Sequence, residues 1–177
     1  MKKAVFIDRD GILNQLDPTR PQGIPTDIDQ FKATPGIRPL LQRLRNAGLP
    51  IIVTTHQPGL SDGSLSWNML NRMHNVLTSL KLVDDILVCP HKAEEKCPCC
   101  PPAPGLFREA GNKYELTLNY CFAVSLRWQE IAAIKTVGGI PIQIQSPKNA
   151  RRNPIKTVKD FEEAVDKIIS MNKQNPQ

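Results

Sequence analysis

Residues 4–14, AVFIDRDGILN, place a short apolar run directly before two carboxylates and a glycine. The run is apolar at successive positions, which is typical of a strand buried on both faces of a parallel sheet. Asp8 and Asp10 then follow at its carboxyl end, and Gly11 permits the chain to turn there. Two interpretations are open at this point. The stretch is either a solvated Asp-Gly turn or a nucleophile beside a group that transfers protons.

Strands and helices alternate along the rest of the chain. Thr34 is expected to cap the first helix, with Pro35 at its first helical position. Thr157 and Asp160 are expected to form a capping box at the start of the last helix. Hydrophobic periodicity predicts strands at residues 3–8, 50–55, 84–88, 119–124 and 139–144, and helices at residues 34–48, 66–80, 103–114, 127–137 and 157–169. This order predicts an α/β fold, a Rossmann-like three-layer sandwich with a central parallel sheet of about five strands and no large cap domain. We expect one domain over residues 1–170 and a flexible tail over 171–177.

Composition and charge narrow the class of protein. The chain has 177 residues, of which 40% are apolar, and it has no apolar run of 18 residues and no secretory leader pattern. We therefore expect a cytoplasmic protein without a membrane span, and by analogy a monomer. The net charge is +6, with much of the basic excess in residues 146–156, SPKNARRNPIK. No aromatic-plus-basic pattern accompanies that segment, which argues against a nucleic-acid partner.

The polar residues of interest all follow predicted strands. Asp8 and Asp10 follow the first strand, Thr55 ends the second, a cysteine-rich segment follows the third, and residues 124–128 follow the fourth. Ligands of parallel sheets bind beyond the carboxyl ends of the strands. This convergence favours the chemical interpretation of the two aspartates.

The cysteine-rich segment, residues 89–100, reads CPHKAEEKCPCC and predicts a zinc loop after the third strand. Three thiolates and one imidazole fill a tetrahedral zinc site, which would make the ion structural. The expected ligands are Cys89, His91, Cys97 and Cys99. Cys100 could compete for the ion, and a cluster of free thiols or disulfides is the alternative. Cys121 is most simply a core residue.

Three segments together resemble a known family. FIDRDGILN, VTTHQPGL and CPHKAEEKCPCC, in this order, resemble the haloacid dehalogenase superfamily, and within its subfamily IIIA the phosphatases of heptose 1,7-bisphosphate and of histidinol phosphate. The resemblance extends from residue 6 to about residue 169. It implies that Asp8 attacks phosphorus to form an aspartyl-phosphate, and that Asp10 protonates the leaving oxygen and later activates water. It also implies that the zinc loop shapes the substrate entrance.

The same resemblance implies a phosphate-binding run at Thr55, His56 and Gln57. The Thr55 hydroxyl and adjacent amides would hold phosphoryl oxygens. His56 stands where the family usually has asparagine. It is either a phosphate or substrate contact or a loop histidine hydrogen-bonded to the backbone.

Two other motifs of the family are altered. Where the family reads Cys-Arg-Lys-Pro-x-Pro-Gly, this chain has Cys100 and Pro101 in place of the arginine and the phosphate-bridging lysine. At the fourth strand the family reads Val-Gly-Asp-x-x-x-Asp. A gap-free alignment puts Val124 and Trp128 at the two magnesium-binding aspartates. Arg127 is not counted as a replacement in this alignment. Asp8 and Asp10 would be the remaining magnesium ligands, if the chain binds that ion.

In the family, the two motifs that are altered here supply the positive charge that the chemistry needs, through a lysine and a bound magnesium ion. Two like unit charges about 4 Å apart repel by about 4 kcal/mol at an effective dielectric of about 20, and a phosphate dianion beside Asp8 roughly doubles this. We therefore expect a phosphatase-like protein with a structural zinc, an impaired magnesium site and weak or no hydrolase activity. It would bind a small phosphorylated metabolite or a partner. The alternative is an active sugar-phosphate phosphatase that works through Asp8 with atypical metal ligands.

Overall fold

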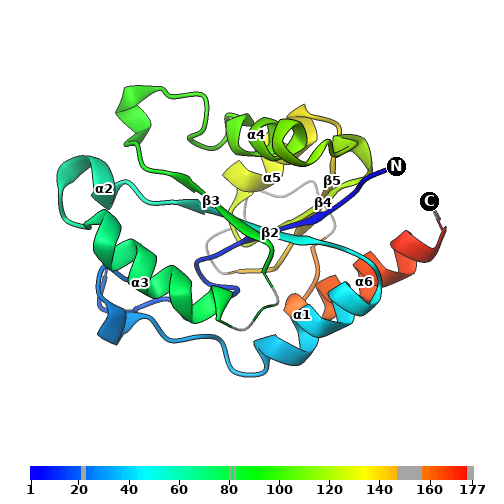
Figure 1. The fold of residues 1–177 in the computed structure, drawn as a ribbon, viewed down its shortest axis with the longest axis horizontal. Coiled ribbons are helices and arrows are strands. Elements are labelled where there is room, and N and C mark those ends of the chain that lie inside the picture. The colour runs from blue at the N-terminus through cyan, green and yellow to red at the C-terminus, as the bar shows by residue number, and fades with distance from the viewer. Residues whose placement is uncertain (21–22, 80, 82, 147–156, 175–177) are drawn as a thin grey trace.

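Five parallel strands lie at the centre of the computed structural model, which describes residues 1–20, 23–79, 81, 83–146 and 157–174 (Figure 1). Their order across the sheet is β3-β2-β1-β4-β5. The strands are β1 (Val5–Asp8), β2 (Ile51–His56), β3 (Asp85–Cys89), β4 (Phe122–Ser125) and β5 (Ile140–Gln143). The central strand, β1, pairs with β2 and β4, so that the ends of these three strands meet at one edge.

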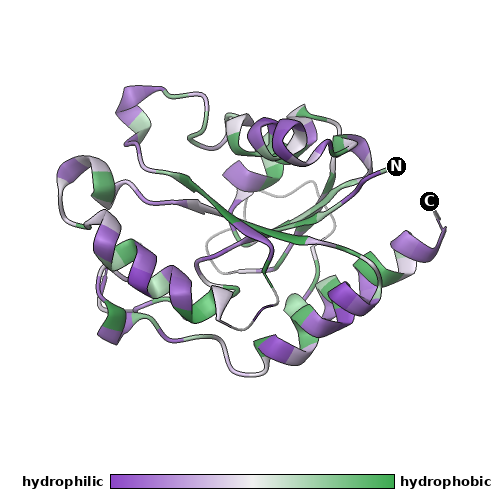
Figure 2. Ribbon diagram, viewed as in Figure 1, coloured by the Kyte–Doolittle hydropathy of each residue, from purple (hydrophilic) through white to green (hydrophobic). Residues whose placement is uncertain are grey.

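Helices cover both faces of the sheet, which confirms the predicted three-layer α/β sandwich. One face carries α1 (Ile37–Asn46), α3 (Trp67–Thr78) and α6 (Phe161–Gln174), and the other carries α4 (Gly105–Tyr114) and α5 (Trp128–Thr136) (Figure 1). Shorter turns are α2 (Gly59–Asp62) and three 3₁₀ helices, at Ile28–Gln30, Ala93–Glu95 and Leu118–Tyr120. Figure 2 shows the apolar residues concentrated along the strands and the inner helix faces.

The apolar run of β1 is explained by burial on both sides of the sheet. Val5 and Ile7 pack into the cluster that includes residues of α1, α3 and α6. Phe6 packs into the opposite cluster, where its ring meets the Phe107 ring edge-on with centroids 4.9 Å apart. Because successive side chains of a strand point to opposite faces, a central strand must be apolar at every position.

Three sequence expectations about boundaries were wrong. The cap of α1 is Gly36, with φ of +73°, and not Thr34. The last helix begins after Asp160, whose carboxylate accepts a hydrogen bond from the Glu163 amide, and Thr157 takes no part in that contact. That helix continues to Gln174, beyond its expected end at residue 169. The basic residues 147–156 lie outside the described residues. Among the described helices, none has the length and apolar character to cross a membrane.

Candidate functional site

Asp8 and Asp10 lie at the carboxyl edge of the sheet and are almost fully buried, with 1% and 3% of their surface exposed. Burial excludes the solvated-turn interpretation. The chain turns at Gly11, which has φ of +87° and donates its amide to the Asn14 carbonyl. The positive φ favours glycine, and a Cβ at this position would lie 2.5 Å from Leu126 Cδ1, so that side chain would have to shift.

Asp8 is held by a bidentate ion pair with Arg127. Arg127 Nε donates to Asp8 Oδ2 over 2.9 Å and Nη2 donates to Oδ1 over 2.8 Å, while Ser125 Oγ donates to Oδ2 over 2.8 Å. Burial alone would lower the pKa of Arg127, but the charge and hydrogen bonds of Asp8 raise it overall, so the guanidinium stays protonated. Both carboxylate oxygens of Asp8 are therefore occupied by donors from the segment after β4.

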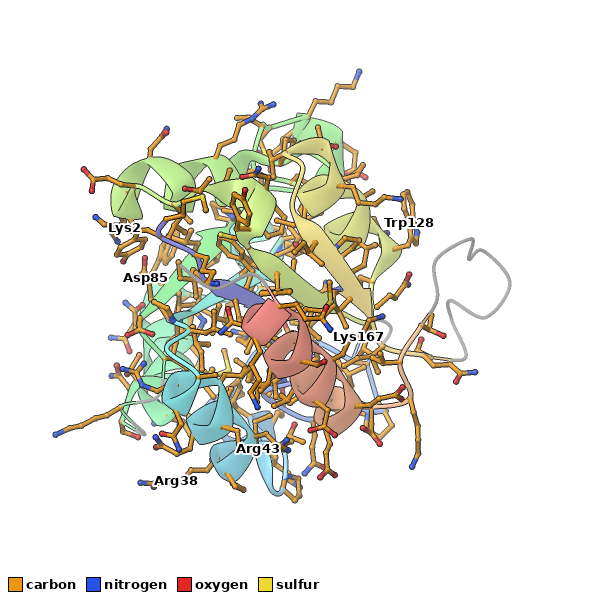
Figure 3. The ribbon with its side chains drawn as sticks, turned by 90° about the vertical axis from the view of Figure 1, so that its right-hand side faces the viewer. Lys2, Arg38, Arg43, Asp85, Trp128 and Lys167 are labelled. Carbon is orange, nitrogen blue, oxygen red and sulfur yellow. The ribbon has the colours of Figure 1, made fainter. Side chains whose placement is uncertain are left out.

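The position that faces Asp8 across β4 is Ser125 and not Val124. Val124 pairs with Ile7 in the register and its side chain lies in the apolar cluster beneath the sheet. Ser125 is one residue further, and its hydroxyl contacts Asp8. The gap-free alignment that put Val124 and Trp128 at the acidic positions is thus wrong by one residue at this strand. The same shift moves the second position from Trp128, which is exposed at the surface (Figure 3), to Gln129.

Asp10 is bound by a different set of donors. The Arg9 guanidinium, which has no exposed surface, contacts both oxygens of Asp10 at 2.9–3.2 Å. Thr55 Oγ1 and Gln57 Nε2 donate to Asp10 Oδ2 over 3.2 and 2.8 Å. Behind this group, Arg9 Nη1 lies 3.1 Å from His74 Nε2. Burial and the charge of Arg9 lower the pKa of His74 to about 4, so that its neutral ring accepts this bond.

Two of the three residues of the predicted phosphate-binding run lie beside Asp10, and the third, His56, does not. Thr55 and Gln57 are fully buried beside Asp10, and the Gln57 amide also donates to Thr55 Oγ1 over 2.7 Å. His56 points the other way, and its Nε2 donates to the His91 carbonyl over 2.7 Å. Burial lowers the pKa of His56, which keeps this ring neutral at pH 7. His56 therefore forms the backbone contact that was one of its two interpretations.

The residues around Asp8 do not fit a magnesium ion. Mg²⁺ requires oxygen ligands, and the oxygens of Asp8 are held by Arg127 and Ser125. Two carboxylates are matched by the guanidinium groups of Arg9 and Arg127, which leaves the site without net negative charge. A divalent cation about 4 Å from a guanidinium is repelled by about 8 kcal/mol at an effective dielectric of about 20. The ion could enter only if Arg127 moved away.

The sequence-based interpretation missed Arg127 and Ser125 as partners of Asp8. The signal was present, because Ser125, which ends β4, and Arg127 have the same spacing that Asp8 and Asp10 show at the end of β1. Lys92, in the cysteine-rich loop, forms a surface ion pair, with its Nζ 3.7 Å from Asp62 Oδ2.

The four predicted zinc ligands lie together in a geometry that fits the ion. Their ligand atoms all lie within 4.8 Å of one another. The Cys89, Cys97 and Cys99 sulfurs are 3.3–3.7 Å apart, and His91 Nδ1 is 3.3 Å from Cys99 Sγ. The edges of a tetrahedron with metal–sulfur bonds of about 2.3 Å are about 3.8 Å long. All five cysteines of the chain are free thiols, which contradicts the disulfide alternative.

A buried carboxyl group, Glu130, lies in the first turn of α5 behind the Arg127–Asp8 pair. It is 2% exposed, and both its oxygens lack a hydrogen-bond partner among the described residues. Burial and the negative charge of Asp8 raise the pKa of Glu130 to about 8, against a smaller opposing effect of Arg127. Glu130 is therefore largely protonated at neutral pH.

We expect Glu130→Gln to stabilise the protein at pH 8 but not at pH 4.5. The folded-state pKa is above the ordinary value of 4.5, so the protonated carboxyl contributes stability below pH 4.5 that is lost as pH rises toward 8. Glutamine cannot ionise and avoids this loss, which is on the order of 4 kcal/mol at pH 8. Urea unfolding at both pH values measures the effect, with exposed Glu109→Gln as the matched control. An equal effect of Glu130→Gln at both pH values would contradict the assignment.

The fold and the paired carboxylates at its sheet edge define a phosphatase scaffold of the haloacid dehalogenase type. The crystal structure of D,D-heptose 1,7-bisphosphate phosphatase from B. bronchiseptica, complexed with magnesium and phosphate, matches with a TM-score of 0.85 and 25% identity. The match covers 97% of this chain and 99% of that one. No protein-family model matches the sequence.

Curated relatives narrow the assignment. The D-glycero-β-D-manno-heptose-1,7-bisphosphate 7-phosphatase of Bordetella bronchiseptica is 30% identical over 149 residues, which cover 81% of each chain. The enzyme of the same name from Pasteurella multocida is 31% identical over 153 residues, covering 76% of this chain and 77% of that protein. The chain belongs to the heptose bisphosphate phosphatase family, as its motifs indicated.

Proposed function

We propose that this chain is a family member with little or no magnesium-dependent phosphohydrolase activity, and that it binds a small phosphorylated metabolite. The observation that supports this is the bidentate pair of Arg127 with Asp8. The guanidinium occupies the oxygens that a nucleophile must direct at phosphorus and that a cation would ligate. A carboxylate with both oxygens hydrogen-bonded to a cation is a weaker nucleophile.

The same arrangement supports binding of a phosphate group. Arg127 uses Nε and Nη2 for Asp8, so Nη1 takes no part in that pair, and the side chain is 28% exposed. A phosphoryl oxygen could accept a charge-assisted hydrogen bond from Nη1. Because each carboxylate already carries a guanidinium partner, the anion does not meet an uncompensated negative charge as it enters. Recognition would thus proceed without a metal ion.

Phosphatase assays test this proposal. We expect hydrolysis of heptose 1,7-bisphosphate and of an aryl phosphate, each with magnesium, at least about a thousandfold below typical turnover of about 10 s⁻¹. Inorganic phosphate or a phosphorylated sugar should bind in calorimetry without magnesium, and Arg127→Ala should weaken that binding. Turnover in the ordinary enzyme range, lost in Asp8→Asn, would overturn the proposal.

The second candidate is an active sugar-phosphate phosphatase that works through an aspartyl-phosphate at Asp8. It is supported by the names of the relatives and by the retained Asp8, Asp10 and Thr55. This function requires Arg127 to release Asp8 when substrate enters and to stabilise the transferring phosphoryl group itself. In that case Arg127→Ala would abolish turnover, whereas under the first proposal there is little turnover to lose.

We further propose that the cluster of Cys89, His91, Cys97 and Cys99 binds a structural zinc ion. When bound, zinc would fix the loop between β3 and α4, and four protein ligands would leave it no open position for chemistry. The loop contains little apolar core of its own between its ligands, KAEEK, so that its conformation depends on the ion.

We expect Cys97→Ser to reduce the zinc content per chain and to lower Tm by about 5–10 °C. Cys97 is less buried than Cys89, so its substitution tests the metal more than the core. Elemental analysis and calorimetric unfolding measure the two effects. A chelator should reproduce the lower Tm in the wild type and leave the variant unchanged. Equal metal content and Tm in both proteins would contradict the site.

A further inference from the structure

A second group of metal-binding side chains lies directly beside the proposed zinc cluster. His56 Nε2, Cys89 Sγ and Cys100 Sγ lie within 4.8 Å of one another. His56 ends β2, Cys89 ends the neighbouring strand β3, and Cys100 closes the cysteine-rich loop. Cys89 belongs to both groups. We propose that these three residues bind a second thiophilic cation, with the Cys89 sulfur bridging the two ions.

The distances fit this assignment. Cys100 Sγ lies 3.5 Å from His56 Nε2. A zinc ion with bonds of about 2.3 Å to sulfur and about 2.0 Å to nitrogen places two such ligands about 3.5 Å apart. The pair is therefore already spaced as two ligands of one ion. Cys89 and Cys100 are buried and His56 is half-buried, so the ion would be largely shielded from water.

Binding requires two protons to move. The Cys100 thiol proton is released to solvent, because the thiolate is the ligand. His56 Nε2 now donates to the His91 carbonyl over 2.7 Å, so its proton must transfer to Nδ1 and that hydrogen bond is exchanged for a metal–nitrogen bond. The bridge rests on the first zinc site proposed above, in which Cys89 would already be a thiolate, and a thiolate sulfur has a further lone pair for the second ion.

The donor set selects the kind of ion. Thiolate and imidazole ligands favour Zn²⁺ and other thiophilic cations over Mg²⁺ or Ca²⁺, which prefer oxygen. Three protein ligands leave the fourth position of a tetrahedral zinc ion open, unlike the closed first site. His56 and Cys100 are 44 residues apart in the sequence, and the fold brings their side chains together.

The number of bound zinc ions tests the proposal. Metal-free full-length protein is titrated with Zn²⁺, and native mass spectrometry counts the ions per chain. We expect two ions in the wild type and one in either His56→Asn or Cys100→Ser. Cys121→Ser is the matched control, because Cys121 lies in the core just before β4, and it should retain two ions.

The count also separates this proposal from the first zinc site. One ion in the wild type at saturating zinc would overturn the second site and leave the first in place. Two ions in both His56→Asn and Cys100→Ser would equally overturn the ligand assignment. If the wild type bound no ion, both sites would be refuted. Cobalt substitution gives an independent readout, since Cys100→Ser and His56→Asn should each remove the part of the sulfur-to-metal charge-transfer absorption that comes from the second ion, while Cys121→Ser should keep it.

Discussion

Replacing Ser125 with aspartate and Arg127 with alanine should raise magnesium-dependent hydrolysis of a phosphate monoester by about a hundredfold to a thousandfold. The Arg127 change frees both oxygens of Asp8. The Ser125 change puts a carboxylate where a hydroxyl now lies 2.8 Å from Asp8 Oδ2. Together they make the site more negative by two charges, which converts a neutral site into one that attracts a divalent cation.

An aryl phosphate assay over a range of magnesium concentrations measures this gain, and calorimetry measures the ion directly. Ser125→Asn with Arg127→Ala is the matched control, because it keeps the size of the side chain at position 125 without its charge. Adding Asp8→Asn to the active variant should abolish the gain. A folded double variant that binds magnesium yet hydrolyses no faster would contradict the expectation that Arg127 and the missing carboxylate at position 125 are what limit hydrolysis.

The same assay separates the two alignments of β4. Aspartate at position 124 would point into the apolar cluster below the sheet, where an unpaired charge is costly. We therefore expect Val124→Asp to destabilise the protein without a gain in activity. A gain in activity with aspartate at position 125 but not at position 124 would identify position 125 as the acidic one by function as well as by geometry.

The fold followed from the sequence because its signals were local and repeated. Strands buried on both faces must be apolar throughout, and β1 and β2 are. The alternation of such strands with amphipathic helices admits few topologies. Helix starts were harder, since the chain begins α1 after a left-handed Gly36 where Thr34 and Pro35 offered an equally good cap pattern.

The site was predictable where it depended on strand ends and ligand spacing. Asp8, Asp10 and Thr55 had to meet because parallel neighbours end at one edge. The role of Arg127 was not predictable, because a shift of one residue turns a strand side chain to the opposite face. The gap-free alignment was displaced by that one residue at β4. Ser125 was therefore not recognised as a contact of Asp8, and Arg127 was not counted as a replacement. Where a guanidinium points depends on the burial and charges around it, and these are known only from the structure.

The largest expected loss of stability comes from Arg9→Leu, which we expect to lower the free energy of unfolding by about 3–5 kcal/mol. Arg9 is fully buried and contacts both oxygens of Asp10. Its guanidinium also bonds His74 and lies 5.6 Å from the centre of the Phe31 ring. Without it, Asp10 keeps the Thr55 and Gln57 donors and a longer contact of 4.0 Å with Arg127 Nη2 against the cost of a buried charge.

Urea unfolding at pH 7 measures this loss against Arg43→Leu as a control. Arg43 forms an ion pair with Asp166 at the surface, where the two side chains are 40% and 59% exposed (Figure 3). Such a pair contributes about 1 kcal/mol or less. Adding Asp10→Leu to Arg9→Leu should recover part of the stability, because the unpaired charge is removed as well. A loss below about 1 kcal/mol in Arg9→Leu would mean that Thr55 and Gln57 alone suffice to hold the Asp10 charge. In that case Arg127 alone would keep the site without net negative charge when no magnesium is bound.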